Sequence, residues 1–137
     1  MFFKKEDKKE DIPLSKIGSL LIHAAKIDEH YSNEEEEIIK KTLISLGAKE
    51  ENIDDVIKTS IKEEENSNQI LEFTKEVKNL PEISKIKIIE ALWKIIYSNQ
   101  NADIYETNLM RRLAGLLYID NKIMGDIKEK IKNEKTK

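Results

Sequence analysis

The sequence contains no cysteine among its 137 residues. Disulfide bonds, thiolate nucleophiles and cysteine zinc sites are therefore excluded, and so is any thiol-based reduction by this chain. A chain of this length can bury a core large enough to fold without such cross-links. It is also a normal size for one domain, so we expect a single domain.

Glycine and proline are scarce as well, with four and two residues respectively. Because these residues end helices and form turns, their scarcity leaves long uninterrupted stretches, in which apolar residues recur at helical spacing. The pattern indicates an all-α fold. No apolar run reaches the length of a transmembrane helix, and the first residues lack the apolar central region of a secretory signal.

Neither positive nor negative charge is in large excess. The 24 basic and 27 acidic residues nearly balance, and the net charge is −3. Proteins that bind the phosphates of nucleic acid carry a basic patch or stripe. We therefore expect no nucleic-acid binding.

Apolar periodicity and helix-end signals predict about seven helices in one compact bundle. Gly47 is a natural C-terminal cap, Ser67 and Asp120 are suited to N-caps, and Pro81 is suited to a first turn. The longest expected helix, 81–98, would be the central one. Four of the expected helices span 14–27, 33–47, 81–98 and 104–117. The other three begin at about 51, after 67 and after 120.

The helical domain is expected to span residues 14–132. The segments 1–13 and 133–137 are dominated by charged residues, and we expect both to be disordered. Apolar stripes within the domain are expected to form its core, with the tryptophan and the methionines as filler rather than as a cofactor site. The residues predicted to be buried include Ile17, Leu43, Ile57, Leu71, Phe73, Ile89, Trp93, Met110 and Met124.

An internal repeat becomes visible when the chain is aligned with itself at an offset of 71 residues. Segment 21–48 then matches segment 92–119 without a gap, and both the apolar face and the polar joint stay in register. This pattern predicts two helix–loop–helix hairpins of the same geometry around a pseudo-twofold axis. Matched pairs include Leu21 with Leu92, Asp28 with Asn99, Glu35 with Glu106, and Leu46 with Leu117.

The joints between the paired helices have a structural interpretation. Ser32 is suited to an N-cap, and Glu35 three residues later is suited to close a capping box; Asp103 and Glu106 match this pattern in the second hairpin. Asp28 is left unexplained, because an acid at the C-terminal end of a helix faces the negative end of the helix dipole.

A functional interpretation of the first joint accounts for Asp28. The pattern D-x-H-x-S-x-x-E brings oxygen ligands together, as a hard divalent cation such as Ca²⁺ or Mg²⁺ requires. The loop is not an EF-hand, because Asn33 and Ile39 occupy the positions where that loop needs glycine and glutamate. The candidate ligands are Asp28, His30, Ser32 and Glu35.

The second joint offers a weaker set of candidate ligands. Asn99 stands where the first joint has Asp28, and an amide contributes an oxygen but no charge. The candidate ligands of this second metal site are Asn99, Asn101, Asp103 and Glu106.

These two joints carry a resemblance to a known family. The stretches are "AKIDEHYSNEE" (25–35) and "YSNQNADIYETNLMRRLAGLL" (97–117). In each, an aspartate or its replacement follows an apolar helix, and a glutamate stands seven residues later, beyond an N-cap. The chain resembles the TerB-like tellurite-resistance family over about residues 14–131, and the block "YETNLMRRLAGLL" is most similar to its uncharacterised bacterial branch.

The resemblance implies a small, cytoplasmic, non-enzymatic bacterial protein that acts in stress or tellurite resistance. It also implies that the acidic joints bind a divalent cation. Members of this family are found near the inner membrane in larger assemblies, so the resemblance implies an unidentified protein partner at the inner face of the membrane.

Enzyme classes find little support in the residues themselves. His23 lies beside Leu20 and Ile27 on the first expected helix, where a partly buried histidine with a satisfied hydrogen bond is the usual case. His30 lies in the following loop, so the two histidines do not share a helix as a metal pair would. The four glycines are isolated and form no phosphate loop. We therefore expect no catalytic residues.

An interaction module that needs no metal is the alternative function. The acidic runs 33–37 and 62–66 would meet a basic partner, although such runs usually form solvated helix faces. The first residues, Phe2, Phe3, Lys4 and Lys5, have a similar pair of interpretations: a solvated leader, or a contact with a membrane or partner.

Overall fold

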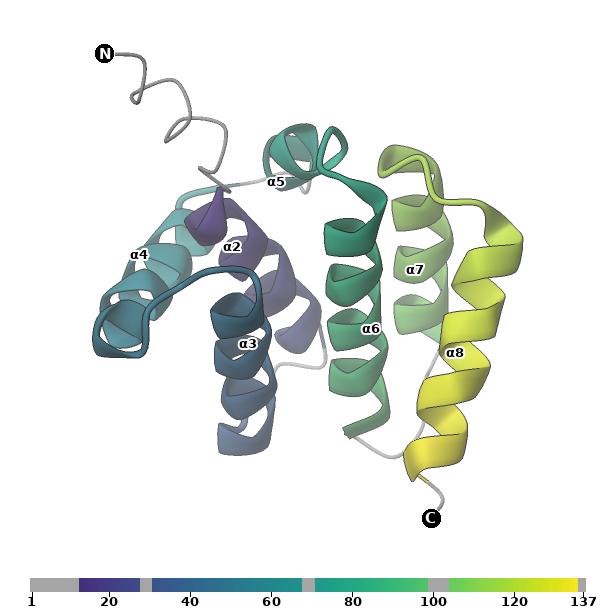
Figure 1. Ribbon diagram of the computed structural model, residues 1–137, viewed down its shortest axis with the longest axis horizontal. Helices are drawn as coiled ribbons and strands as arrows, with labels where there is room; N and C mark the ends of the chain where they lie inside the picture. The colour runs from purple at the N-terminus through teal and green to yellow at the C-terminus, as the bar shows by residue number, and fades with distance from the viewer. Residues whose placement is uncertain (1–12, 28–30, 68–70, 99–103, 136–137) are drawn as a thin grey trace.

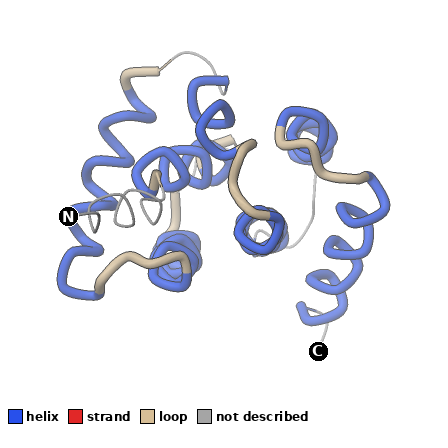
Figure 2. The backbone as a smooth tube through the Cα atoms, turned by 45° about the horizontal axis from the view of Figure 1, so that its top comes forward, coloured by secondary structure: helices blue, strands red, loops and turns tan. Residues whose placement is uncertain are grey.

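The computed structural model describes residues 13–27, 31–67, 71–98 and 104–135, with the side chains of 104–106 and 135 left out. These parts of the chain form α-helices and one 3-10 turn, without any strand (Figure 2). The all-α prediction is confirmed. The elements are α2 (Leu14–Ala25), α3 (Asn33–Ser45), η1 (Glu50–Asn52), α4 (Ile53–Glu65), α5 (Leu71–Val77), α6 (Glu82–Ser98), α7 (Ile104–Leu116) and α8 (Asn121–Lys135).

The ends of the chain were expected to be disordered. Helix α8 continues through Lys135, past the expected domain end at 132. The leader residues 1–12 and the last two residues lie outside the described part of the chain. None of the described helices is both long and apolar enough to cross a bilayer.

Two helices share the centre of the bundle. Helix α2 packs against α3, α4, α5 and α6, and α6 packs against α2, α3 and α8. Figure 1 shows α6 standing between α2 and α3 on one side and α7 and α8 on the other. We expected the helix over 81–98 to be the central one, but α2 is enclosed on as many sides. Ten of its twelve residues are apolar or small and can face neighbours all round.

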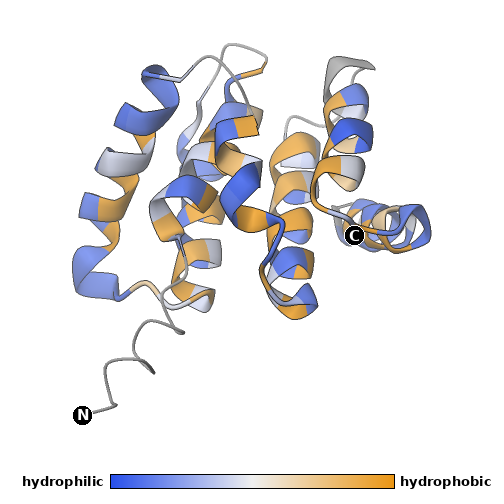
Figure 3. Cartoon of the chain, turned by 90° about the horizontal axis from the view of Figure 1, so that it is seen from above, coloured by the Kyte–Doolittle hydropathy of each residue, from blue (hydrophilic) through white to orange (hydrophobic). Residues whose placement is uncertain are grey.

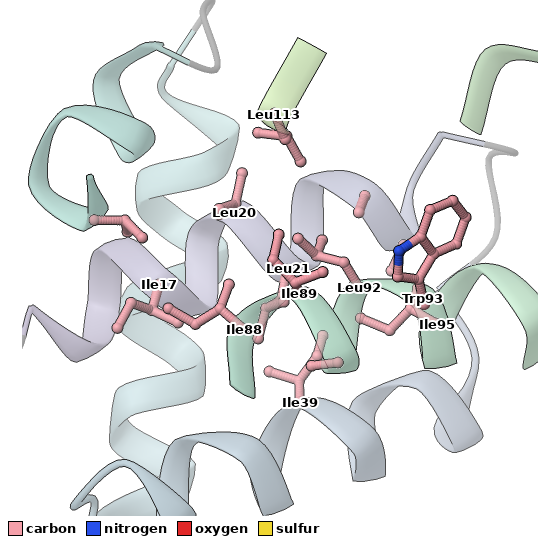
Figure 4. Close-up of a cluster of buried hydrophobic side chains, with 14 of the residues drawn as sticks. Ile17, Leu20, Leu21, Ile39, Ile88, Ile89, Leu92, Trp93, Ile95 and Leu113 are labelled. Carbon is pink, nitrogen blue, oxygen red and sulfur yellow. The ribbon is translucent and has the colours of Figure 1, made fainter. Parts of the chain in front are cut away.

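One apolar cluster fills the space between the helices. The close-up in Figure 4 shows Leu21 and Ile39 beside Ile88 and Ile89 of α6, whereas Leu20 lies on the side of α2 that faces Leu113. Each of these side chains is fully buried. Each such burial contributes roughly 1.5–3 kcal/mol. Figure 3 shows hydrophobic residues gathered on the inward sides of the helices. The prediction that the tryptophan and two of the methionines fill the core is confirmed by Trp93, Met110 and Met124.

One predicted core residue is wrong. Leu71 is 48 % exposed, whereas Phe73 and Val77 of the same short helix are buried. Phe73 and Val77 are four residues apart and share a face, while Leu71 lies about 200° around the helix from Phe73. A run of apolar residues in a helix of seven residues therefore cannot all point inward.

The repeat predicted at an offset of 71 residues is present in the backbone. The bounds of α3, 33–45, map onto those of α7, 104–116, and α2 and α4 map onto α6 and α8. The ends of α3 and α7 also match, because Ala48 N–H donates to Leu43 O and Ile119 N–H donates to Ala114 O, each at 2.9 Å. The residue before each donor has a positive φ, 122° at Gly47 and 59° at Tyr118. Both helices thus end in a Schellman motif.

Candidate functional site

The first joint is organised by a capping box at the start of α3. Ser32 adopts an extended backbone, and its Oγ accepts a hydrogen bond from Glu35 N–H at 3.1 Å. In return, Glu35 Oε1 accepts from Ser32 N–H at 2.8 Å and from the Ser32 hydroxyl at 3.2 Å. The structural interpretation of these two residues is confirmed, because the box satisfies backbone donors that the helix itself leaves unpaired.

Glu35 is a fully buried carboxylate, with 0 % of its surface exposed. A buried charge is unfavourable by several kcal/mol unless hydrogen bonds or opposite charges compensate for it. The cap donors provide part of this compensation, and the positive end of the α3 dipole provides more. The cap therefore holds one carboxylate in a fixed position inside the joint.

Two carboxylates lie near the hydroxyl of Tyr31 in the first joint. Burial raises the pKa of the Tyr31 hydroxyl, and the nearby carboxylates of Glu36 and Glu35 add to the rise. Glu36 forms an ion pair with Lys40 at 3.3 Å, and Lys40 also lies 3.2 Å from Asp54. Hydrogen bonds to Asp54 and Glu36 raise the pKa of Lys40. One half-buried lysine thus forms ion pairs with two carboxylates at the edge of the joint.

Only half of the predicted first ligand set can be placed. Ser32 and Glu35 lie together, as described above, whereas Asp28 and His30 lie outside the described residues. Among the residues that the structure does describe, no three acidic or histidine side chains come together as a metal site.

Most residues of the second predicted ligand set lie outside the part of the chain that the structure describes. Asn99, Asn101 and Asp103 lie in an undescribed range, and only the backbone of Glu106 is described, at the start of α7. The second metal site therefore stays a prediction from the sequence.

A polar cluster beside the first joint was missed by the sequence analysis. Glu64 of α4 accepts a hydrogen bond from Lys26 Nζ at 2.8 Å, and its other oxygen lies 3.3 Å from His23 Nδ1. The Glu64 side chain is only 12 % exposed. No local pattern reveals this cluster, because its members are about 40 residues apart in the chain. His23 is a partly buried histidine with a hydrogen-bonding partner, as predicted.

The same contacts affect how much of the acidic run 62–66 is available to a partner. Glu63 lies 3.7 Å from Lys16, and Glu64 is held by Lys26 and His23. Two glutamates of the run therefore point back at α2 and join α4 to it. The run is less available to a basic partner than its sequence indicates.

Comparison with known protein families identifies one match, which covers most of the chain. The family model described as tellurite resistance protein TerB matches residues 15–129. Comparisons with curated proteins and with solved structures found no match. The matched range contains both joints and every described helix except the ends of α2 and α8. The chain therefore belongs to the TerB family of tellurite resistance proteins.

Proposed function

We propose that this TerB-family chain is a non-enzymatic binding module that takes a divalent cation at its first joint. It acts in bacterial stress or tellurite resistance as a component of a larger assembly. The observation that supports the cation site is Glu35, a carboxylate that is fully buried and held by its own helix cap. The pKa of Tyr31, raised by burial and by the neighbouring carboxylates, is consistent with a negative potential at the same place.

The ligand chemistry favours Ca²⁺ or Mg²⁺. Both are hard cations that prefer carboxylate, hydroxyl, carbonyl and water oxygens. Glu35 would be shared between the cap and the cation, as the several acceptor positions of a carboxylate permit. Asp28 would supply the second charge, and the cation would offset the unfavourable position of this acid after α2.

Calorimetric titration of Ca²⁺, Mg²⁺ and Mn²⁺ into chelator-treated protein tests the site. The wild type is expected to release or absorb heat in a saturable titration, and the Asp28→Ala/Glu35→Ala double variant is expected to give a flat trace. Asp28→Asn removes the charge without touching the cap, so it separates loss of a ligand from damage to α3. Flat traces for the wild type with all three ions would overturn the cation site.

A matched control uses an acid of the same helix turn that lies outside the ligand set. Glu37 is exposed and belongs to the run 33–37. Glu37→Gln removes one negative charge from the same region and is expected to retain saturable binding. If Glu37→Gln weakens binding as much as Asp28→Asn does, then the ion responds to general negative potential and not to a built site.

The metal-independent interaction module is the second candidate. Glu34 and Glu37 favour it, because both are exposed in the run 33–37, whose acids begin in the first turn of α3. The test is capture of partners from a lysate with and without a chelator. The same partner in both captures would make the cation incidental, and a partner that is lost with the chelator would support the cation site.

The location proposed for the chain is the cytoplasm, at the inner face of the membrane. The support comes from family membership and from Phe2, Phe3, Lys4 and Lys5, which combine apolar rings with positive charge. Deletion of residues 2–10 is expected to lower co-sedimentation with vesicles that contain anionic lipid. Unchanged co-sedimentation would refute a membrane contact through this segment.

A further inference from the structure

A pocket lies between the C-terminal half of α2 and the middle of α7. Its volume is about 460 Å³, and its described lining residues are His23, Ile27, Asn108, Leu109 and Arg112. Pockets that hold small organic ligands usually measure about 300–1,000 Å³. This pocket is therefore large enough for a small metabolite.

The pocket lies at a place where the two repeats pack differently. At an offset of 71 residues α2 corresponds to α6 and α3 to α7, so the α2–α7 contact is the counterpart of the α3–α6 contact. Helix α3 packs directly along α6, whereas α2 and α7 make little contact between their described residues. One of two equivalent contacts is thus closed by packing, and the other is left open.

The polar side chains of the pocket suit an anionic group. Arg112 is exposed and forms no ion pair with any described residue. Its guanidinium can bind a carboxylate or phosphate through two parallel hydrogen bonds. Asn108 lies one helical turn earlier on the same face. Its Oδ1 accepts a hydrogen bond from Arg111 at 3.4 Å, so the amide N–H groups of Asn108 point away from Arg111.

The remaining lining gives the pocket a fixed polar edge and an apolar floor. Glu64 holds Nδ1 of His23, which fixes the ring and leaves Nε2 on the opposite edge. Ile27 and Leu109 supply apolar surface. No acidic side chain belongs to the described lining, and the nearby charge of Glu64 is already balanced by Lys26.

We propose that this pocket binds a small organic anion. Its carboxylate or phosphate group pairs with Arg112 and Asn108, and its apolar part lies on Ile27 and Leu109. The site uses none of the residues proposed as cation ligands, and it involves a ligand of opposite charge.

The test is NMR titration of the ¹⁵N-labelled full chain in the presence of a chelator. The probes are benzoate, phenyl phosphate and inorganic phosphate. Benzoate or phenyl phosphate is expected to cause saturable shifts centred on the amides of Ile27, Asn108, Leu109 and Arg112. Inorganic phosphate, which has no apolar part, is expected to bind more weakly.

Two neighbouring arginines provide matched variants. Arg112→Gln is expected to weaken binding about tenfold or more, because a hydrogen-bonded charge pair contributes roughly 1.5–3 kcal/mol. Arg111→Gln is expected to weaken binding much less, because Arg111 lines a different pocket, with Trp93 and Met110, and reaches the site only through its long hydrogen bond to Asn108. Both residues are exposed, so neither variant should impair folding, and the NMR spectrum without probe verifies this.

Three results would overturn the proposal. The first is the absence of saturable shifts with both organic probes. The second is equal weakening by Arg111→Gln and Arg112→Gln, and the third is inorganic phosphate binding as tightly as phenyl phosphate. Because the chelator removes divalent cations, these outcomes are independent of whether the cation site exists.

Discussion

The two halves of the molecule, α2–α3–α4 and α6–α7–α8, share a topology but are packed by different means. Helices α2 and α4 approach closely at Gly18, where an added Cβ would overlap Ser60 Oγ and would lie 2.9 Å from Ser60 Cβ. Ser19 Oγ also reaches Ser60 O at 2.9 Å. The residues equivalent to Gly18 and Ser60 in the second half are Ile89 and Ile131, both buried.

This difference teaches that one backbone arrangement can be stabilised in two ways. The first half brings helix backbones together through small residues, and the second half keeps them apart with bulky aliphatic side chains. This difference accompanies the open space between α2 and α7.

The largest effect is expected from Gly18→Ala. The new methyl group would overlap the Ser60 side chain and force α2 and α4 apart, so the free energy of unfolding should fall by roughly 2–3 kcal/mol in urea denaturation. Gly115→Ala in α7 is the matched control, because a Cβ there meets nothing within 4 Å. It should gain roughly 0.5–1 kcal/mol from helix propensity. If Gly18→Ala is neutral, the close approach is not what stabilises the first half.

A smaller loss is expected from Lys85→Met, at a position where the first half has Leu14. Lys85 is buried, and its Nζ donates to Leu117 O at 2.9 Å and to Lys78 O at 3.2 Å. Methionine retains the stem but leaves both carbonyls without this donor, so thermal unfolding should report a loss of about 1–2 kcal/mol.

Lys87→Met serves as the control for Lys85, because Lys87 makes one exposed bond, to Ser45 O at 3.3 Å. Its effect should stay within about 0.5 kcal/mol. Equal losses for the two variants would mean that the Lys85 contacts do not hold the second half together.

Ser32→Ala should destabilise the first half by about 1 kcal/mol, the usual effect of losing an N-cap. The carboxylate of Glu35 would also lose the Ser32 hydroxyl as a donor, while the backbone N–H of residue 32 would still donate to it. Ser32→Thr keeps a hydroxyl and should remain close to the wild type in chemical denaturation. A larger loss for threonine than for alanine would contradict the capping role.

The smallest effect is expected from Tyr118→Gly, which gives the end of α7 the residue that α3 has at Gly47. Relief of the positive φ of 59° is favourable by about 1 kcal/mol, and loss of the Lys78 contact with the ring, at 5.8 Å, offsets part of this gain. The net gain should be about 0.5 kcal/mol in thermal unfolding. Tyr118→Ala loses the same ring but keeps the strain, so it should be less stable than Tyr118→Gly.

The sequence predicts the helices well because their signals are local. Periodicity, the C-cap at Gly47 and the capping box of Ser32 and Glu35 each involve residues within a few positions of one another. Leu71 shows the limit, since the apolar run at the start of α5 does not reveal which of its members faces the core. The shared centre of α2 and α6 is also not visible in local patterns.

Contacts between distant residues could not be predicted from one sequence. The bonds of Glu64 to His23 and Lys26 and those of Lys85 to Leu117 join segments 32–41 residues apart. The pocket between α2 and α7 likewise depends on how the two halves meet. The position of Glu35 in its joint was predicted, whereas its complete burial was not.

A crystal soaked in Mn²⁺ and examined for anomalous density tests the cation site most directly. The proposed function predicts one strong peak within about 2–3 Å of carboxylate oxygens from both Asp28 and Glu35. A first joint without any peak, with the Asp28 side chain in solvent or paired with a lysine or arginine, would contradict it.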